Sequence, residues 1–140
     1  MEVVLGITTR PLYKKRIEKF VLWSYEMHLQ NQSFAQLSYL PKISTDHVMP
    51  QELKGDWRKV IAEDAHKEAV HLWGNLIPFS DKENSCKGSK SYEDARARLA
   101  EETAFLTTKK FLTKHEKWDE EGIRERTHEL ANWALSRWPK

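Results

Sequence analysis

The chain has 140 residues, of which 39% are hydrophobic and 31% charged, and this is the size and composition of one soluble globular domain. It contains no apolar run of the roughly 18–20 residues that cross a membrane, and its first residues lack the basic and apolar regions of a secretory signal, so we expect a cytoplasmic protein. A net charge of +2 is too small to indicate a nucleic-acid-binding protein by itself, and the single cysteine, Cys86, excludes an internal disulfide and a Cys-rich structural zinc site.

The first predicted element is a helix over residues 11–30. Apolar side chains recur there at helical spacing, Thr9 is placed to cap the start, and Pro11 suits the first turn. The broad face that we expect to be buried consists of Leu12, Tyr13, Ile17, Phe20, Val21, Ser24 and Tyr25.

Two short strands with a helix between them follow in the middle of the chain. Residues 42–47 and 74–80 have the pattern of strands. Pro78 favours an edge position for the second strand, because proline cannot donate a hydrogen bond to a neighbouring strand. A helix is predicted between the strands from about Asp56 to Val70, and Gly55 breaks the chain before it.

Two further helices are predicted toward the C-terminus, over residues 91–106 and 119–138. Asp119 is the expected N-cap of the second. One stripe of this helix should face the core, and it consists of Ile123, Thr127, Leu130, Ala134 and Trp138. Together the elements predict an α+β fold that is mostly helical, with one small two-stranded sheet.

Asp46 and His47 stand side by side where the first predicted strand ends. Such a dipeptide alone is most often a solvated turn. The second strand begins beside Asn75, however, and Asn84 follows that strand, so the order strand, strand, helix would bring an acid, a histidine and two carboxamides together. Oxygen ligands suit a hard ion such as Mg²⁺ or Mn²⁺, and a neutral imidazole can take a proton from water. Phosphodiester hydrolysis requires such parts.

A longer pattern surrounds these four residues. It consists of Asp46, His47, Pro50 and Gln51, then Gly74, Asn75 and Leu76, and finally Asn84, Ser85, Ser89, Lys90 and Tyr92. In this order and spacing the pattern resembles the HNH, or ββα-metal, endonuclease motif, and in particular the C-terminal nuclease domain of GmrSD-type modification-dependent restriction proteins. The C-terminal helix also resembles the closing helix of that family, with its Ile-x-x-Arg-Thr and terminal Trp-Pro. Asn84 stands where founding members of the HNH group carry histidine, and it still offers an oxygen to a metal.

The resemblance implies a single nuclease domain over residues 1–140. It would contain an N-terminal helix (11–30), a ββα-metal core with a helical insert (42–98) and C-terminal helices (99–138). It further implies that this domain is an effector taken from a longer protein, whose N-terminal domain hydrolyses a nucleotide and senses the DNA modification.

The same resemblance assigns roles to individual residues. Asp46 and Asn84 would hold one divalent ion, Mg²⁺ or Mn²⁺, and His47 would be the general base. Asn75 would hold the loop that bears the histidine.

Further residues near the motif have two explanations each. Lys90, and less surely Lys87, would contact the DNA backbone, since no acid lies between them in the sequence. The other explanation is that they belong to an ordinary solvated loop. His71 would be an accessory residue that orients the phosphate, or else a packed or hydrogen-bonded histidine. The remaining histidines are expected on helix surfaces, and they are His28, His66, His115 and His128.

The function implied is a DNA endonuclease that nicks one strand and serves a modification-sensing restriction or anti-phage system. Two alternatives stay open. One is a nonspecific nuclease or toxin domain that acts on DNA or RNA, and the other is a noncatalytic DNA-binding module with the HNH fold. No predicted element carries a set of side chains suited to contact base edges, so the sequence indicates no target sequence.

Overall fold

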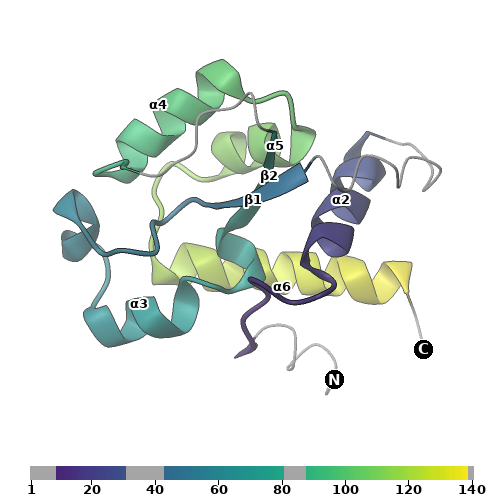
Figure 1. Cartoon of the computed structure of the whole chain (residues 1–140), viewed down its shortest axis with the longest axis horizontal. Helices are drawn as coiled ribbons and strands as arrows, with labels where there is room; N and C mark the ends of the chain where they lie inside the picture. Colours follow the sequence, from purple (N-terminus) through teal and green to yellow (C-terminus); the bar gives the residue numbers. More distant parts are fainter. Residues whose placement is uncertain (1–8, 31–42, 81–87, 139–140) are drawn as a thin grey trace.

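The computed structural model describes residues 9–30, 43–80 and 88–138, which form a mainly helical α+β fold around a small sheet (Figure 1). The predicted fold class is therefore confirmed. The elements, in chain order, are α2 (Glu18–Leu29), β1 (Ile43–His47), the 3₁₀ helix η2 (Gly55–Lys59), α3 (Glu63–Ala69), the 3₁₀ helix η3 (Trp73–Asn75), β2 (Leu76–Ser80), α4 (Tyr92–Glu102), α5 (Leu106–Lys114) and α6 (Glu120–Arg137).

The sheet consists of β1 and β2, which pair antiparallel. His47, the last residue of β1, lies opposite Leu76, the first residue of β2, and Asp46 lies opposite Ile77. Both strands lie within the predicted segments, although β2 begins two residues later because residues 74 and 75 belong to η3. Pro78 lies opposite Thr45. In a two-stranded sheet each strand is an edge, so the missing N–H of this proline is tolerated.

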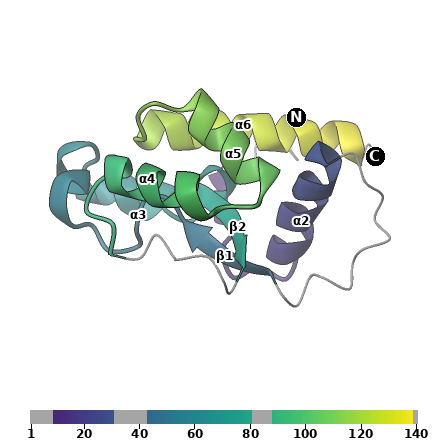
Figure 2. The same cartoon turned by 90° about the horizontal axis from the view of Figure 1, so that it is seen from above.

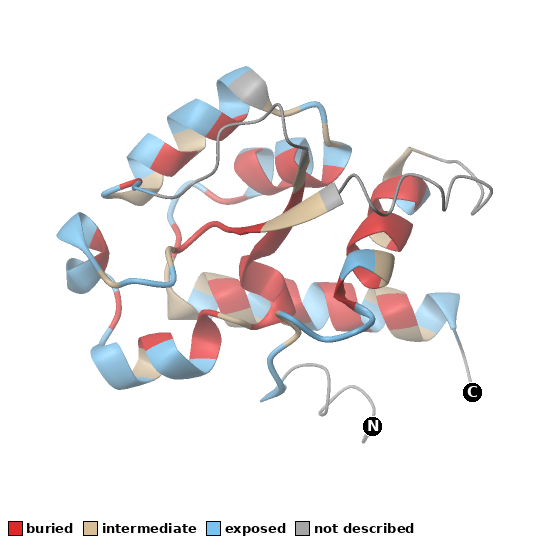
Figure 3. Ribbon diagram, in the orientation of Figure 1, coloured by how far each residue is buried: buried red, intermediate tan, exposed pale blue. Residues whose placement is uncertain are grey.

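The helices enclose the sheet, as two views show. In Figure 1 the strands cross at the centre, α4 and α5 lie above them, α6 runs beneath, and α2 stands at one side. Figure 2 shows the same arrangement from above, with β1 and β2 at one edge of the helical layer. The strands and the inward faces of the helices are buried, while the outer faces of α3 and α4 are exposed (Figure 3). None of the helices in the described part of the chain has the length and apolarity needed to span a membrane.

The main core lies between the sheet, the 3₁₀ turns and the C-terminal helices. Its largest fully buried members are Trp57 and Trp118. A second cluster joins α2 to α6 through Trp73 and Leu76, and it contains Val21, Leu22, Leu130 and Ala134. Burying side chains of this size contributes about 1.5–3 kcal/mol each, so α2 and α6 are held to the sheet mainly by this packing.

α6 also forms hydrogen bonds to the turn that leads into β2. The backbone N–H of Gly74 donates to Oγ1 of Thr127 (2.9 Å), whose own hydroxyl donates to the carbonyl of Ile123 (2.6 Å). Arg126 is buried, and its Nη1 donates to the carbonyls of Gly74 (2.6 Å) and Leu76 (3.0 Å). A Cβ on Gly74 would lie 2.1 Å from the carbonyl oxygen of Ile123, so only glycine fits there. The Ile-x-x-Arg-Thr pattern therefore serves to hold the Gly-Asn-Leu segment.

The predicted N-cap of α6 is confirmed, whereas the predicted start of the first helix, at residue 11, is wrong. Asp119 accepts a hydrogen bond from the N–H of Gly122 (2.9 Å). α2 begins at Glu18 rather than residue 11, and Thr9 does not cap it. The reason is a turn at Lys14, which has a left-handed backbone (φ 63°) that cannot continue a right-handed helix.

Two other predicted helices are shorter than expected. The segment from Asp56 to Val70 is divided into η2 and α3, with residues 60–62 between them. The division lets Trp57 reach the core, where its indole N–H donates to the carbonyl of Ser89 (3.1 Å). The helix predicted over 91–106 ends at Glu102, and α5 is a separate helix that we did not predict.

Burial also differs from the prediction at several side chains. Ile17 is 57% exposed and Trp138 is 37% exposed, so neither belongs to a buried stripe. His66 and His115 are buried rather than on helix surfaces. His28 and His128 are exposed, as predicted.

Candidate active site

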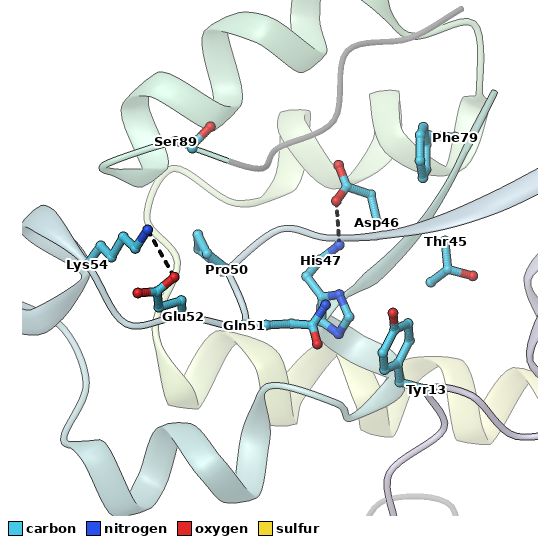
Figure 4. Close-up of a pocket in the computed structure, with 11 residues that line it drawn as sticks. Tyr13, Thr45, Asp46, His47, Pro50, Gln51, Glu52, Lys54, Phe79 and Ser89 are labelled. Carbon is cyan, nitrogen blue, oxygen red and sulfur yellow. Dashed lines mark hydrogen bonds and ion pairs between the residues drawn. The ribbon is translucent and has the colours of Figure 1, made fainter. Parts of the chain in front are cut away.

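A cavity of about 380 Å³ opens at the C-terminal end of β1 (Figure 4). It is the place where the strand, the turn before α2 and the loop before α4 meet. The residues that line it are Tyr13, Thr45, Asp46, His47, Pro50, Gln51, Glu52, Lys54, Phe79, Gly88 and Ser89. Polar and ionisable groups from segments far apart in the sequence thus share one cavity.

Asp46 and His47 point to opposite sides of β1 (Figure 4), as successive side chains of a strand do. Both are nevertheless cavity-lining residues, and each is only 5% exposed. Oδ1 of Asp46 accepts a hydrogen bond from the backbone N–H of His47 (2.9 Å). The carboxylate is therefore fixed relative to the imidazole, and the two side chains present different chemistry to the same space.

The His47 ring is held by His71 and Tyr13. Nε2 of His47 lies 3.0 Å from Nδ1 of His71, so one nitrogen donates and the other accepts. The Tyr13 ring stacks on His71 at 5.0 Å between centroids and makes a T-shaped contact with His47 at 4.4 Å between centroids. The turn that carries Tyr13 is itself anchored, because the N–H groups of Leu12 and Tyr13 donate hydrogen bonds to the carbonyl of His71 (2.9 and 3.4 Å).

The environment keeps both imidazoles neutral. The pKa of His47 is lowered from 6.5 to about 3. The main cause is burial of the ring, and the neighbouring His71 and His66 make smaller contributions. The pKa of His71 is lowered as well, mainly by burial and to a smaller extent by His66 and Lys14. A neutral imidazole has a lone pair that can accept a proton, and His47 is in this form at neutral pH.

Asn75 lies behind the cavity rather than in its wall and is completely buried. Its Oδ1 accepts from the N–H of Met49 (2.8 Å) and from the indole of Trp118 (2.9 Å), and its Nδ2 donates to the carbonyls of Met49 and Val70 (both 2.9 Å). The backbone carbonyl of Asn75 also accepts from the N–H of Val48 (3.0 Å). The segment that follows His47 is therefore tied to this one residue, through its side chain and its backbone carbonyl.

The opposite wall of the cavity is anchored to η2. The N–H of Asp56 donates to the carbonyl of Lys90 (2.9 Å), and the indole of Trp57 donates to the carbonyl of Ser89. A Cβ on Gly55, which has φ +56°, would lie 2.7 Å from the same Lys90 oxygen. Lys90 itself is exposed beside Ser89, which is buried and whose Oγ has no hydrogen-bond partner among the described residues.

The predicted metal site is described only in part. Asn84 and Lys87 lie outside the described residues, and so does Cys86. Within the described ranges, no group of three His, Cys, Asp or Glu residues is placed to hold an ion. Asp46 fits the predicted role by its chemistry, because its carboxylate lines the cavity and oxygen donors are those that Mg²⁺ and Mn²⁺ prefer.

The sequence did not indicate several residues of this site. Tyr13 was expected on a buried helix face, and His66 on a helix surface. His66 instead donates from Nε2 to the carbonyl of Pro50 (2.8 Å), in the cavity wall. The Tyr13 turn and His66 reach the site through contacts across the chain, which no local pattern reveals.

Comparison with known proteins identifies the family. A family model described as GmrSD restriction endonucleases, C-terminal domain, matches residues 6–133, which include every described residue of the cavity. The comparisons with curated proteins and with solved structures found no match. The chain therefore belongs to the family of GmrSD restriction endonuclease C-terminal domains, a family of nuclease domains.

Proposed function

We propose that the chain is a metal-dependent DNA endonuclease of the HNH type. One observation carries the proposal: in a chain of this restriction endonuclease family, Asp46 and the neutral, hydrogen-bonded imidazole of His47 share one cavity. The order β1, β2, α4 along the chain is the order of a ββα-metal core. The bond cleaved is a phosphodiester of DNA.

His47 is the proposed general base. Its Nδ1 makes no hydrogen bond within the described part of the chain, whereas Nε2 is paired with His71. With the proton on Nε2 and donated to His71, the lone pair of Nδ1 is available to a water molecule in the cavity. Nδ1 accepts a proton as the water oxygen bonds to phosphorus; the bond from phosphorus to the leaving oxygen breaks, and that oxygen takes a proton from a second water molecule. A phosphodiester anion nearby favours the protonated imidazole, so bound substrate raises the pKa of His47.

Asp46 and Asn84 are the proposed ligands of one Mg²⁺ or Mn²⁺ ion. When bound, the ion supplies positive charge that neutralises the phosphate as hydrolysis proceeds. The hydrogen bond from the backbone N–H of His47 orients the Asp46 carboxylate next to the residue that carries the base. Asn75 acts at a distance from the chemistry, because its hydrogen bonds hold the segment after His47.

The substrate backbone is proposed to contact the wall formed by residues 88–90. Lys90 is exposed there, and the Ser89 hydroxyl has a donor with no partner among the described residues. Both can donate to phosphate oxygens. Lys87 is proposed to act in the same way.

In the full-length protein the domain is proposed to be the effector of a modification-sensing restriction or anti-phage system. A nucleotide-hydrolysing N-terminal domain would sense the modified DNA and license cleavage. One ion and one base serve one strand, so a single copy of the domain nicks DNA.

A plasmid assay tests the proposal. Wild-type protein should convert supercoiled plasmid to the nicked form with Mg²⁺ or Mn²⁺ and not with EDTA. His47→Ala should reduce the rate by about 10²–10⁴, the usual cost of losing a general base, while circular dichroism shows an intact fold. His128→Ala is the matched control, since this histidine is exposed on α6 and lies outside the cavity.

Nicking by His47→Ala at the wild-type rate would reject the assignment of the base. Binding of plasmid without any cleavage would favour the noncatalytic alternative. Faster cleavage of RNA than of DNA would favour the alternative of a nonspecific nuclease or toxin domain.

A further inference from the structure

Positive charge is concentrated in the turn that precedes α2 and in the first residues of this helix. Residues 10–19 contain five bases and one acid, whereas the remaining residues contain 18 bases and 20 acids. The five bases are Arg10, Lys14, Lys15, Arg16 and Lys19, which are all exposed. We call these five side chains the basic turn. In the part of the chain that the structure describes, none of them forms an ion pair.

The one acid of this segment faces inward. Glu18 is buried, and its carboxylate accepts hydrogen bonds from the backbone N–H of Lys14 and from the hydroxyl of Thr45. Thr45 belongs to β1 and lines the cavity. The acid therefore fastens the basic turn to the strand that carries the site, instead of pairing with a base at the surface.

The basic turn lies at the rim of the cavity. Tyr13 lines the cavity, and Nζ of Lys14 lies 5.5 Å from the centre of the Tyr13 ring. The left-handed backbone of Lys14 and the hydrogen bonds from Leu12 and Tyr13 to the carbonyl of His71 fix the path of the chain there. The backbone that carries the bases is thus fixed beside His71, and Lys14 is the base that lies against Tyr13.

We propose that the basic turn binds the phosphate backbone of duplex DNA next to the cavity. This inference rests on the proposed function, because it names the surface that brings the substrate to that site. In Figure 4, Tyr13 and Ser89 lie on opposite sides of Asp46 and His47. Lys14 follows Tyr13 in the chain and Lys90 follows Ser89, so the two segments that line these sides of the cavity each carry a cation for a phosphate of the DNA.

The chemistry of the surface determines the kind of binding. Duplex DNA carries one negative charge per about 1.7 Å of its axis, and each neutralised phosphate releases condensed counterions. Exposed lysines and arginines that form no ion pair with the described residues do this without first giving up an acidic partner. The binding is independent of base sequence, because phosphate contacts position a protein and do not discriminate between bases.

The test compares two double variants that remove the same charge from different surfaces. Lys15→Ala/Arg16→Ala changes the basic turn. Lys109→Ala/Lys117→Ala is the matched control, since both lysines are exposed, have no ion pair among the described residues and lie outside the cavity wall. Binding of a fluorescein-labelled duplex is measured by anisotropy with EDTA, at salt concentrations between about 50 and 200 mM, where the affinity depends steeply on salt.

We expect Lys15→Ala/Arg16→Ala to weaken binding and to flatten the log–log salt dependence by about 0.9 for each phosphate that is no longer neutralised, hence by nearly two. The control should leave the slope as in the wild type. Equal slopes in both variants would overturn the inference, and so would a wild-type chain whose binding does not depend on salt. Tighter binding of a duplex RNA of the same sequence would also overturn it, since the surface would then fit a different nucleic acid.

The outcome is separable from that of the proposed function. Anisotropy with EDTA requires no cleavage, so a slope change confined to Lys15→Ala/Arg16→Ala supports the surface even if the plasmid stays intact. Conversely, plasmid nicking by the wild type together with equal slopes in the two variants would uphold the nuclease and reject the basic turn as its DNA-binding surface.

Discussion

Nε2 of His47 and Nδ1 of His71 lie 3.0 Å apart, which makes the two histidines a hydrogen-bonded pair. The two residues come from different segments, the end of β1 and the turn before η3, and the Tyr13 ring covers both. A hydrogen bond to one imidazole nitrogen decides which tautomer the ring adopts. In the proposed mechanism Nε2 of His47 donates to His71, so His71 is a positioning residue that leaves the lone pair of Nδ1 of His47 for the water.

We expect His71→Ala to lower the rate constant of nicking by about 10–100-fold, as when a partner that orients a functional histidine is removed. KM for DNA should change little, because the proposed DNA contacts lie elsewhere. His71→Asn should recover part of the rate, since the amide oxygen can lie close to the place of Nδ1 and accept from His47. Rate constants and KM from plasmid nicking measure both effects. A rate constant equally low in the alanine and asparagine variants would mean that this hydrogen bond does not matter.

Asn75→Ala should destabilise the protein strongly. The substitution leaves the N–H and the carbonyl of Met49, the carbonyl of Val70 and the indole of Trp118 without their partners. Each buried polar group left in this way costs about 1–3 kcal/mol, so the free energy of unfolding should fall by at least about 3 kcal/mol. Urea denaturation with EDTA measures it, and His128→Ala serves as the control. A decrease below about 1 kcal/mol would show that the loop holds without Asn75.

The strands and the motif residues at their ends could be predicted, because the information is local. Strand periodicity and the Asp-His and Gly-Asn-Leu patterns lie within a few residues of one another, and β1 and β2 formed where they were expected. The ends of the helices were less predictable. α2 starts late because Lys14 turns the chain toward His71, and that contact spans nearly sixty residues.

α5 shows the same limit from a different side. Its sequence, LTTKKFLTK, has no acidic or capping residue at its start that would indicate the beginning of a helix. The first turn is instead satisfied by Glu26 of α2, whose buried carboxylate accepts from the N–H groups of Leu106 (3.0 Å) and Thr107 (2.8 Å). A carboxylate at a helix N-terminus is favourable because of the unpaired N–H groups and the helix dipole. Since the partner lies eighty residues away, no local pattern reveals it.

Asp46→Ala should weaken the binding of Mn²⁺, and Asn84→Ala should do the same if the two residues share one ion. The expectation follows from the position of the Asp46 carboxylate in the cavity and from the preference of this ion for oxygen donors. Titration calorimetry at neutral pH measures the affinity. His47→Ala is the control, because a base that is not a ligand leaves ion binding nearly unchanged. Wild-type affinity in both the Asp46 and Asn84 variants would move the metal site to other residues.

The stability of the metal-free protein should fall on acidification because of His47. Burial lowers the pKa of this imidazole to about 3 in the folded chain, whereas its unfolded value is about 6.5. Between these two values the unfolded chain binds more protons, so stability rises with pH. The contribution is complete above about pH 6.5 and is lost as the pH falls toward about 3.

At 1.36 kcal/mol per unit of pKa difference, acidification from about pH 6.5 to 4.5 should remove on the order of 2 kcal/mol through this residue alone. His47→Gln cannot bind the extra proton, so its free energy of unfolding should fall less over the same range. Urea denaturation at several pH values, with EDTA present, measures the difference between the two proteins. His128→Gln is the control, since this exposed histidine should leave the pH dependence as in the wild type. Carboxylates contribute equally in all three proteins, so parallel curves for the wild type and His47→Gln would show that His47 is not held neutral by burial.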